Sequence, residues 1–241
     1  MATRPSETTP GAMRRFYEDV AERTLDRKTS RGIEYRNRTI LARLGSPGRL
    51  LEIGPGEGWL VGAALRSGHQ VVAADLSRRW LSRLPDRNSS SLLRAQGDAA
   101  RLPFPEATFD RVVAAEVLEH LPDPSATIRE ARRVLKPDGR FVATVPYRET
   151  LRRLRCPHCG DEFEPNGHLH SFDEGKLAGL FTDAGLVPGF RLIAPTRFSR
   201  EIWRLANWPP LLPALHALDR ATIGSQRVSD TWLLLEGTRV G

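Results

Sequence analysis

The chain has 241 residues, 40% of them hydrophobic and 27% charged, which is the composition of a globular protein. This composition argues against a collagen, a coiled coil and a wholly disordered chain. The formal net charge of +7 invites a nucleic-acid interpretation, but the basic excess lies mainly in residues 1–49. A basic balance of this kind is normally that of a solvated surface, so the charge alone gives little support to nucleic-acid binding.

No apolar run approaches the length of about 20 residues that spans a bilayer, so we expect no transmembrane segment. The N-terminus lacks the apolar core of a secretory signal, and we expect a cytoplasmic protein. The length predicts one domain with additions. We expect a disordered arm and a helical cover in residues 1–44, followed by one α/β domain in residues 45–241.

After residue 44, short apolar runs alternate with segments of helical periodicity. The sequence predicts strands at Arg49–Ile53, Gln70–Ala74, Leu92–Ala95, Phe109–Ala115, Gly139–Val145, Leu186–Ile193 and Thr231–Glu236. It predicts helices at Trp59–Ser67, Ser77–Leu84, Ser125–Leu135, Asp173–Ala184 and Arg200–Arg220, after two amphipathic helices within Met13–Leu44. Such alternation is typical of a parallel sheet with helices on both faces.

The strongest local signal is the glycine-rich segment Glu52–Gly58, which joins an apolar strand to a helix. Alternating glycines let the backbone bend sharply and approach a ligand. The third glycine, Gly58, comes one position too early for a dinucleotide fingerprint, which disfavours a pyrophosphate. Asp75 ends the next strand, where a carboxylate can accept hydrogen bonds from ribose hydroxyls. The alternative interpretation is a tight turn followed by a helix-capping Asp.

Five segments in this order resemble the class I S-adenosylmethionine-dependent methyltransferases, in particular the branch of ubiquinone and menaquinone biosynthesis. They are Glu52–Gly58, Asp75, Gly97–Phe104, Phe109–Leu121 and Arg133–Arg140. The resemblance implies a seven-stranded, mostly parallel Rossmann-like sheet with an N-terminal helical cover. It also implies a lid insertion after the fifth strand, at residues 148–172.

The resemblance further implies S-adenosylmethionine as the cofactor. The three glycines would approach its methionine part, Asp75 would hold the ribose, Asp98 and Ala99 would lie at the adenine, and Glu116 would begin the loop under the sulfonium. For Asp98, a turn after a strand is the alternative. The full set of implied cofactor-binding residues is Glu52, Gly54, Gly56, Gly58, Asp75, Leu76, Asp98, Ala99 and Glu116.

His120 is the candidate catalytic residue. Methyl transfer from a sulfonium is an in-line displacement, so positioning of the two reactants is its main requirement. If the acceptor is a hydroxyl, the imidazole of His120 can take its proton. A packing role for His120 is the alternative.

Two metal sites are candidates. Glu116, Glu119 and His120, joined by His170, resemble the divalent-ion site of ubiquinone O-methyltransferases and small-RNA terminal methyltransferases, although metal-free relatives have similar residues. Separately, a two-residue spacing lets two thiolates meet one zinc ion, and one or two imidazoles can complete a tetrahedron. A redox-active cysteine pair and a plain surface loop are the alternatives to structural zinc. The residues of this second site are Cys156, Cys159, His168 and His170.

We therefore expect a methyltransferase acting on a small, partly apolar molecule, such as a natural-product intermediate, a sugar or a quinone-like compound. An RNA methyltransferase and a non-catalytic cofactor-binding scaffold are the alternatives. The aromatic segment 197–220 is compatible with an acceptor pocket, contact with a membrane surface, or core packing. The sequence predicts no oligomeric state.

Overall fold

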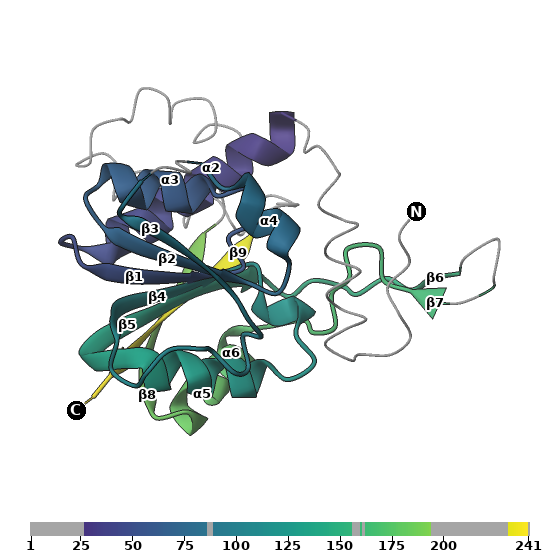
Figure 1. Cartoon of the computed structure of the whole chain (residues 1–241). Helices are drawn as coiled ribbons and strands as arrows, with labels where there is room; N and C mark the ends of the chain where they lie inside the picture. The colour runs from purple at the N-terminus through teal and green to yellow at the C-terminus, as the bar shows by residue number, and fades with distance from the viewer. Residues whose placement is uncertain (1–26, 86–88, 156–159, 161, 194–230, 241) are drawn as a thin grey trace.

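The structure, a computed structural model, describes residues 27–85, 89–155, 160, 162–193 and 231–240. Its centre is one sheet with helices on both faces (Figure 1). The seven strands lie in the order β3-β2-β1-β4-β5-β9-β8. Their bounds are β1 (Arg49–Ile53), β2 (Gln70–Asp75), β3 (Leu92–Gln96), β4 (Phe109–Ala115), β5 (Leu135–Pro146), β8 (Leu186–Ile193) and β9 (Trp232–Arg239).

The sheet is mostly parallel, as the sequence predicts. β1 to β5 pair in parallel, and β9 is antiparallel to both of its neighbours, β5 and β8. Parallel neighbours require crossover connections, which helices provide here. Because both faces are covered, Leu50 and Leu51 of β1 are buried although they point in opposite directions.

Two layers of helices sandwich the sheet (Figure 1). Side chains of α2, α3 and α4 form one core with one face, and those of α5 and α6 form a second core with the other. A short 3-10 helix, η1, follows β4. The helices are α2 (Arg27–Leu44), α3 (Trp59–Arg66), α4 (Arg78–Arg83), η1 (Leu118–His120), α5 (Pro124–Val134) and α6 (Glu174–Asp183).

Helix α5 shows how local sequence sets these elements. The Asp123 side chain accepts a hydrogen bond from the Ala126 amide at 3.0 Å, and Pro124 occupies the first turn, where its missing N–H costs nothing. Ile128, Ala131 and Val134 recur at helical spacing and are fully buried. Burying an isoleucine or valine side chain stabilises the fold by about 1.5–3 kcal/mol.

All seven predicted strands are present, and two of them, β5 and β9, extend at one end by more than one residue beyond the predicted bounds. β5 begins at Leu135 instead of Gly139, because Leu135 pairs with Phe109 across a register shift. The predicted helix over Ser125–Leu135 accordingly ends at Val134. β9 continues to Arg239 because it pairs with β8 as far as Leu186.

The insertion after β5 contains a two-stranded hairpin that the sequence does not predict. β6 (Leu154–Arg155) pairs with β7 (Glu162–Phe163), and this hairpin projects away from the sheet (Figure 1). Cys156 and Cys159 fall between its strands in the sequence but lie outside the described residues. The predicted helix Arg200–Arg220 and the first of the two N-terminal helices also lie outside them.

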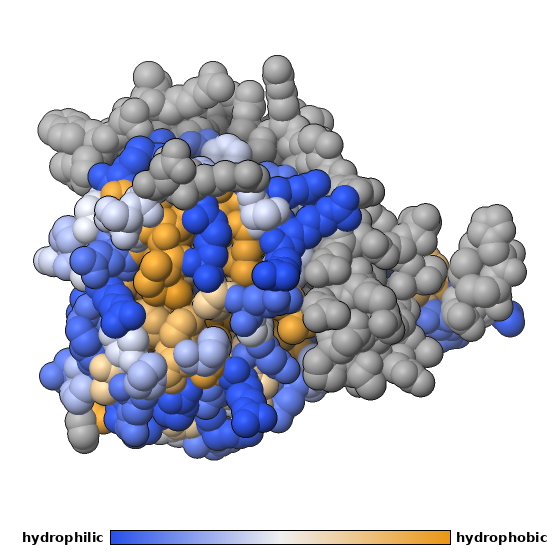
Figure 2. Space-filling model, in the orientation of Figure 1, coloured by the Kyte–Doolittle hydropathy of each residue, from blue (hydrophilic) through white to orange (hydrophobic). Residues whose placement is uncertain are grey.

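The two edge strands, β3 and β8, each pair on one side only within the described part of the chain. Leu93 on β3 and Phe190 on β8 are both 59% exposed. On the face drawn in Figure 2, hydrophilic residues interrupt the hydrophobic surface. Single exposed apolar residues are ordinary on protein surfaces and predict no partner.

Among the described helices, none is both long and apolar enough to cross a membrane.

Candidate functional site

The carboxyl ends of β1, β2 and β4 meet at one edge of the sheet. Ile53 is in register with Ala74 and Ala114, so the residues that follow these three strands emerge side by side. In open α/β sheets, ligands bind in the crevice at this edge. The structure therefore brings the glycine loop, Asp75 and Glu116 to the same edge.

All three glycines of the loop have positive φ, at 65° for Gly54, 51° for Gly56 and 76° for Gly58. A Cβ atom on Gly54 would lie 2.7 Å from a methyl group of Val117, and one on Gly58 would lie 2.7 Å from Leu84. A Cβ atom on Gly56 would meet nothing within 4 Å. The outer two glycines are thus required by packing, whereas Gly56 borders open space that a ligand can fill.

Glu57 lies at the start of α3, which is the place where the pyrophosphate of a dinucleotide would bind. Gly58 caps this helix without a side-chain hydrogen bond. The exposed carboxylate of Glu57 precedes it and accepts a hydrogen bond from the Trp59 indole at 3.3 Å. A helix N-terminus favours a phosphate, but a carboxylate beside it repels one. The structure agrees with the glycine spacing in disfavouring a pyrophosphate.

Asp75 is not the cap of the helix that follows it. Ser77 caps α4 by accepting a hydrogen bond from the Trp80 amide, and the Ser77 amide donates to Asp75 Oδ1 at 2.7 Å. Burial raises the pKa of Asp75 to about 6. The carbonyl of Leu76 accepts a hydrogen bond from Gln96 at 3.1 Å, which ties this turn to β3. Asp75 Oδ2 makes no hydrogen bond within the described residues.

Asp98 lies in the turn that the sequence allowed as an alternative. Its Oδ1 accepts a hydrogen bond from the Ala100 amide at 2.9 Å, and its carbonyl accepts one from Arg101 at 2.9 Å. The side chain is exposed, and Ala99 beside it is half-buried. Contact of Asp98 and Ala99 with an adenine stays a prediction.

Three carboxyl groups lie near one buried arginine at this edge. Glu52 and Glu119 are almost fully buried, at 3% and 1% exposure. Burial raises the pKa of Glu52 to about 8, against the opposing charge of Arg36. Burial also raises the pKa of Glu116, and it raises that of Glu119 well above its ordinary value, with the neighbouring Glu116 adding to the rise. Burial is thus the main cause of all three raised pKa values, and a bound cation would favour the ionised form of these carboxyl groups.

Arg36 and Trp232 complete this part of the site. Arg36 Nη1 lies 3.4 Å from Glu116 Oε2, and the Trp232 indole donates to the same oxygen at 2.8 Å. The Arg36 guanidinium also lies 5.6 Å from the centre of the Trp232 ring. Sequence reasoning missed both residues. Arg36 is one of many arginines, and its only signal is its place beside the buried Tyr35 on an amphipathic helix.

Glu116 has a strained backbone, with φ of 58° in the left-handed region. Such a conformation costs a non-glycine residue about 1–3 kcal/mol, so the surrounding structure must hold it. Its amide donates to the Thr144 carbonyl at 2.9 Å. Strain of this kind is common where a side chain is aimed into a functional site.

Among the described residues, four hydrogen bonds join the insertion to η1 and to Leu121, which follows η1. The amides of Leu169 and His170 donate to the Glu119 carbonyl at 2.7 and 3.2 Å. His120 Nδ1 lies 3.2 Å from the Gly167 carbonyl, and His170 Nε2 lies 2.9 Å from the Leu121 carbonyl. The insertion thus lies directly against the segment that follows β4.

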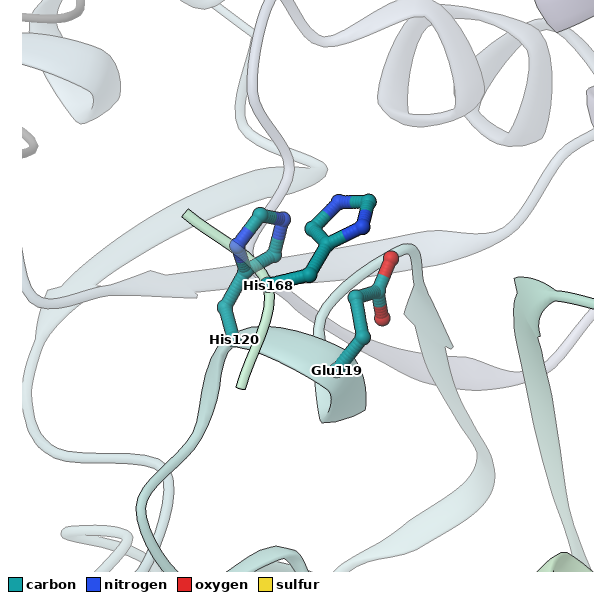
Figure 3. Close-up of side chains that lie close together, drawn as sticks. All are labelled: Glu119, His120 and His168. Atoms are coloured by element: carbon teal, nitrogen blue, oxygen red, sulfur yellow. The ribbon is translucent and has the colours of Figure 1, made fainter. Parts of the chain in front are cut away.

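Glu119, His120 and His168 form a cluster whose candidate ligand atoms all lie within 4.8 Å of one another. Figure 3 shows Glu119 and His120 on η1, with His168 approaching from the insertion. The two imidazole centroids are 4.7 Å apart. Both carboxylate oxygens of Glu119 are buried and lack a hydrogen-bond partner in the described part of the chain. This set contains His168 where the sequence pointed to His170, whose Nε2 is held by a backbone carbonyl.

A family model described as a methyltransferase domain matches residues 21–188, which is more than half of the chain. The chain belongs to the class I S-adenosylmethionine-dependent methyltransferase family. The predicted family and fold are confirmed. The predicted domain boundary at residue 45 stays a prediction, although the family match includes α2.

Several curated relatives are named after the small molecules that they methylate or help to make. The 27-O-demethylrifamycin SV methyltransferase of Amycolatopsis mediterranei is 35% identical over 132 residues, which is 52% of this chain and 48% of that protein. The ubiquinone biosynthesis O-methyltransferase of Xanthomonas oryzae pv. oryzae is 38% identical over 112 residues, which is 44% of this chain and 47% of that protein. The matched segment thus spans about half the length of these relatives.

Solved structures share the fold over most of the chain. The 1,6-didemethyltoxoflavin-N1-methyltransferase of Burkholderia thailandensis has a TM-score of 0.62 at 20% identity, covering 96% of this chain and 87% of that one. The [4+2]-cyclase SpnF has a TM-score of 0.69 at 18% identity and covers 100% of both chains. Since a protein named as a cyclase has this fold, the fold alone does not decide the reaction.

Proposed function

We propose that the protein transfers a methyl group from S-adenosylmethionine to a small, partly apolar acceptor. One observation carries this proposal: the open space beside Gly56 lies at the same strand edge as the buried carboxyl groups of Glu52 and Glu116. The donor carries a positive sulfonium and a positive ammonium group. A cation bound here favours the ionised form of these carboxyl groups, and the resulting negative charge lowers the free energy of the bound cation.

The residues around this space fit the remaining parts of the donor. Asp75 offers Oδ2 to ribose hydroxyls, because its Oδ1 is already bonded to the Ser77 amide. Arg36 offers a buried positive charge to the donor's carboxylate. Asp98 and Ala99 are assigned to the adenine by the family resemblance. When bound, S-adenosylmethionine supplies an electrophilic methyl group.

The chain's own contribution is to align the acceptor and to exclude water. For a hydroxyl acceptor, His120 is the proposed base. The contact between its Nδ1 and the Gly167 carbonyl favours a proton on Nδ1, since a carbonyl only accepts hydrogen bonds. In that tautomer Nε2 is the basic nitrogen.

We also propose a divalent ion held by Glu119, His120 and His168, as an alternative to the role of His120 as a base, because a ring nitrogen that binds a metal ion has no lone pair with which to take a proton. The fit rests on the buried, unpaired carboxylate of Glu119 and on the closeness of the two imidazoles. Two imidazoles and one carboxylate suit zinc, iron or manganese. Such an ion supplies positive charge that orients acceptor oxygens. The structural zinc at Cys156, Cys159, His168 and His170 stays a prediction of the sequence, and it would have to bind without His168 if that residue serves the cluster.

The acceptor is best sought by direct assay. Purified protein is incubated with methyl-labelled S-adenosylmethionine and with fractions of small molecules and of RNA from the producing cell. We expect label in the small-molecule fraction. In parallel, calorimetry is expected to show binding of S-adenosylhomocysteine and none of a nicotinamide dinucleotide. Absence of S-adenosylhomocysteine binding contradicts the proposal, and label in RNA selects the alternative acceptor.

A further inference from the structure

We propose that Glu149 is a positioning residue that fixes the tautomer and the direction of the His168 ring. Through it, the insertion at residues 148–172 completes the cluster of Glu119, His120 and His168. This inference rests on the divalent-ion site of the proposed function and adds a residue outside the ligand set.

The contact between the two side chains sets the tautomer of His168. Glu149 Oε2 and His168 Nδ1 form a short hydrogen bond, and the two side chains are 26% and 11% exposed. An ionised carboxylate only accepts hydrogen bonds, so the proton must lie on Nδ1. Nε2 of a neutral ring then carries the lone pair, and it makes no hydrogen bond in the described residues. A metal ligand whose other nitrogen donates to a carboxylate is a recurrent arrangement in proteins.

The backbone of His168 is held without Glu149. Its amide donates to Glu164 Oε2 at 2.8 Å, and the Asn166 amide donates to the same oxygen at 2.8 Å. The next amide, that of Leu169, donates to the Glu119 carbonyl. Among the described residues, the Glu149 carboxylate has one other contact, at 3.5 Å from the Asn166 side chain, and its negative charge helps to raise the pKa of Glu119. Glu149 therefore acts on the ring, whereas Glu164 acts on the loop.

The pair also joins the two ends of the insertion. Glu149 lies just after β5, and His168 lies after the β6–β7 hairpin, so the contact closes the base of the projecting hairpin. The Arg148 amide, which donates to the Phe172 carbonyl at 2.8 Å, closes the same base. Orientation of the His168 ring is thus tied to the folded state of the insertion.

Glu164 provides a matched control for Glu149. The variants to compare are Glu149→Gln, which keeps an acceptor without the charge, Glu149→Ala, and Glu164→Gln. Long-range ¹H–¹⁵N NMR on metal-free protein reads the tautomer of His168, and calorimetry with Co²⁺ reads the affinity of the cluster. Neither measurement needs the methyl donor or an acceptor.

We expect wild-type His168 to carry its proton on Nδ1 and Glu149→Ala to lose that preference. We expect Co²⁺ to bind about 10-fold more weakly to Glu149→Gln and about 100-fold more weakly to Glu149→Ala, as for other partners of metal-bound histidines. Glu164→Gln is expected to keep the wild-type tautomer and an affinity close to wild type.

Three results overturn the inference. They are a wild-type ring protonated on Nε2 or on both nitrogens, equal losses of Co²⁺ affinity in Glu149→Gln and Glu164→Gln, and no Co²⁺ binding by the wild-type protein. Absence of Co²⁺ binding contradicts the divalent-ion site, whereas the proposed methyl transfer is still tested by the labelling assay. Failure of the labelling assay with an intact effect of Glu149 on Co²⁺ contradicts only the proposed reaction.

Discussion

Arg36 of α2 and Glu116 of the loop after β4 face each other at the carboxyl edge of the sheet, with 3.4 Å between Nη1 and Oε2. Arg36 is 8% exposed, and the indole of Trp232 binds the same carboxylate oxygen. A helix that precedes the first strand thus supplies the positive charge of the site.

Replacing Arg36 by Met is expected to weaken S-adenosylhomocysteine binding by about 10-fold, because the loss of one charge-assisted contact is worth roughly 1.5 kcal/mol. Calorimetry gives the affinity. Arg38→Met is the control on the same helix, since the Arg38 side chain is 41% exposed and pairs with Glu34 instead of Glu116. Equal affinities for the two variants would remove Arg36 from the site.

Filling the space beside Gly56 tests the cofactor assignment. We expect Gly56→Val to reduce S-adenosylhomocysteine affinity at least about 10-fold, since the valine side chain would occupy the open space at the strand edge. The positive φ of this position is expected to cost the variant about 1–2 kcal/mol of stability in addition. Gly179→Ala is the control, because Gly179 on α6 also has no neighbour within 4 Å. Thermal unfolding of both variants separates lost stability from lost binding. Unchanged affinity in Gly56→Val would place the ligand elsewhere.

The raised pKa of Glu52 predicts how stability depends on pH. In the folded protein this pKa is about 8, whereas the ordinary value is 4.5, so the folded state binds more protons between these limits. The contribution of Glu52 to the free energy of unfolding therefore falls as pH rises from 4.5 towards 8, by up to about 1.4 kcal/mol per pH unit. Urea unfolding of wild type and Glu52→Gln at several pH values checks this. A variant that keeps the wild-type slope would show that Glu52 is not its source.

A side chain at Gly237 on β9 is expected to disturb the packing of the core. A Cβ atom there would lie 2.5 Å from Phe181, which stacks on Phe141 in the core. We expect Gly237→Ala to lower the free energy of unfolding by about 1–3 kcal/mol. Gly189→Ala on the neighbouring strand is the control, because Gly189 has open space around it. Similar losses in both variants would attribute the effect to the strand rather than to Phe181.

Metal analysis separates the two candidate metal sites. If the cysteine spacing binds structural zinc, Cys156→Ala is expected to lose one equivalent of zinc while keeping Co²⁺ affinity at the cluster. Glu119→Gln is expected to do the reverse. Wild-type protein free of zinc after purification without chelator would contradict the sequence prediction for the cysteines.

Much of the fold follows from the sequence because parallel strands are continuous apolar runs. The parallel strands β1 and β4 have the predicted bounds, and so does the antiparallel edge strand β8. The start of β5 was harder to predict, since Lys136-Pro137-Asp138-Gly139 contains breakers of regular structure. Only the pairing of Leu135 with Phe109 on the neighbouring strand shows that the strand begins earlier.

The site was predictable only where its residues follow strands. Gly54, Asp75 and Glu116 end or follow strands of one parallel sheet, so their meeting at one edge follows from topology. The meeting of His168 with Glu119, and of Arg36 with Glu116, depends on tertiary packing of an insertion and a helix. The spacing between two histidines in a loop does not show which one turns inward, and here a backbone carbonyl holds His170.

The contribution of α2 has a practical consequence for constructing chimeras. A boundary drawn at residue 45 retains every strand and every glycine of the loop, yet it discards Arg36. A graft of this sheet onto another scaffold should therefore include α2, or place another positively charged side chain beside Glu116.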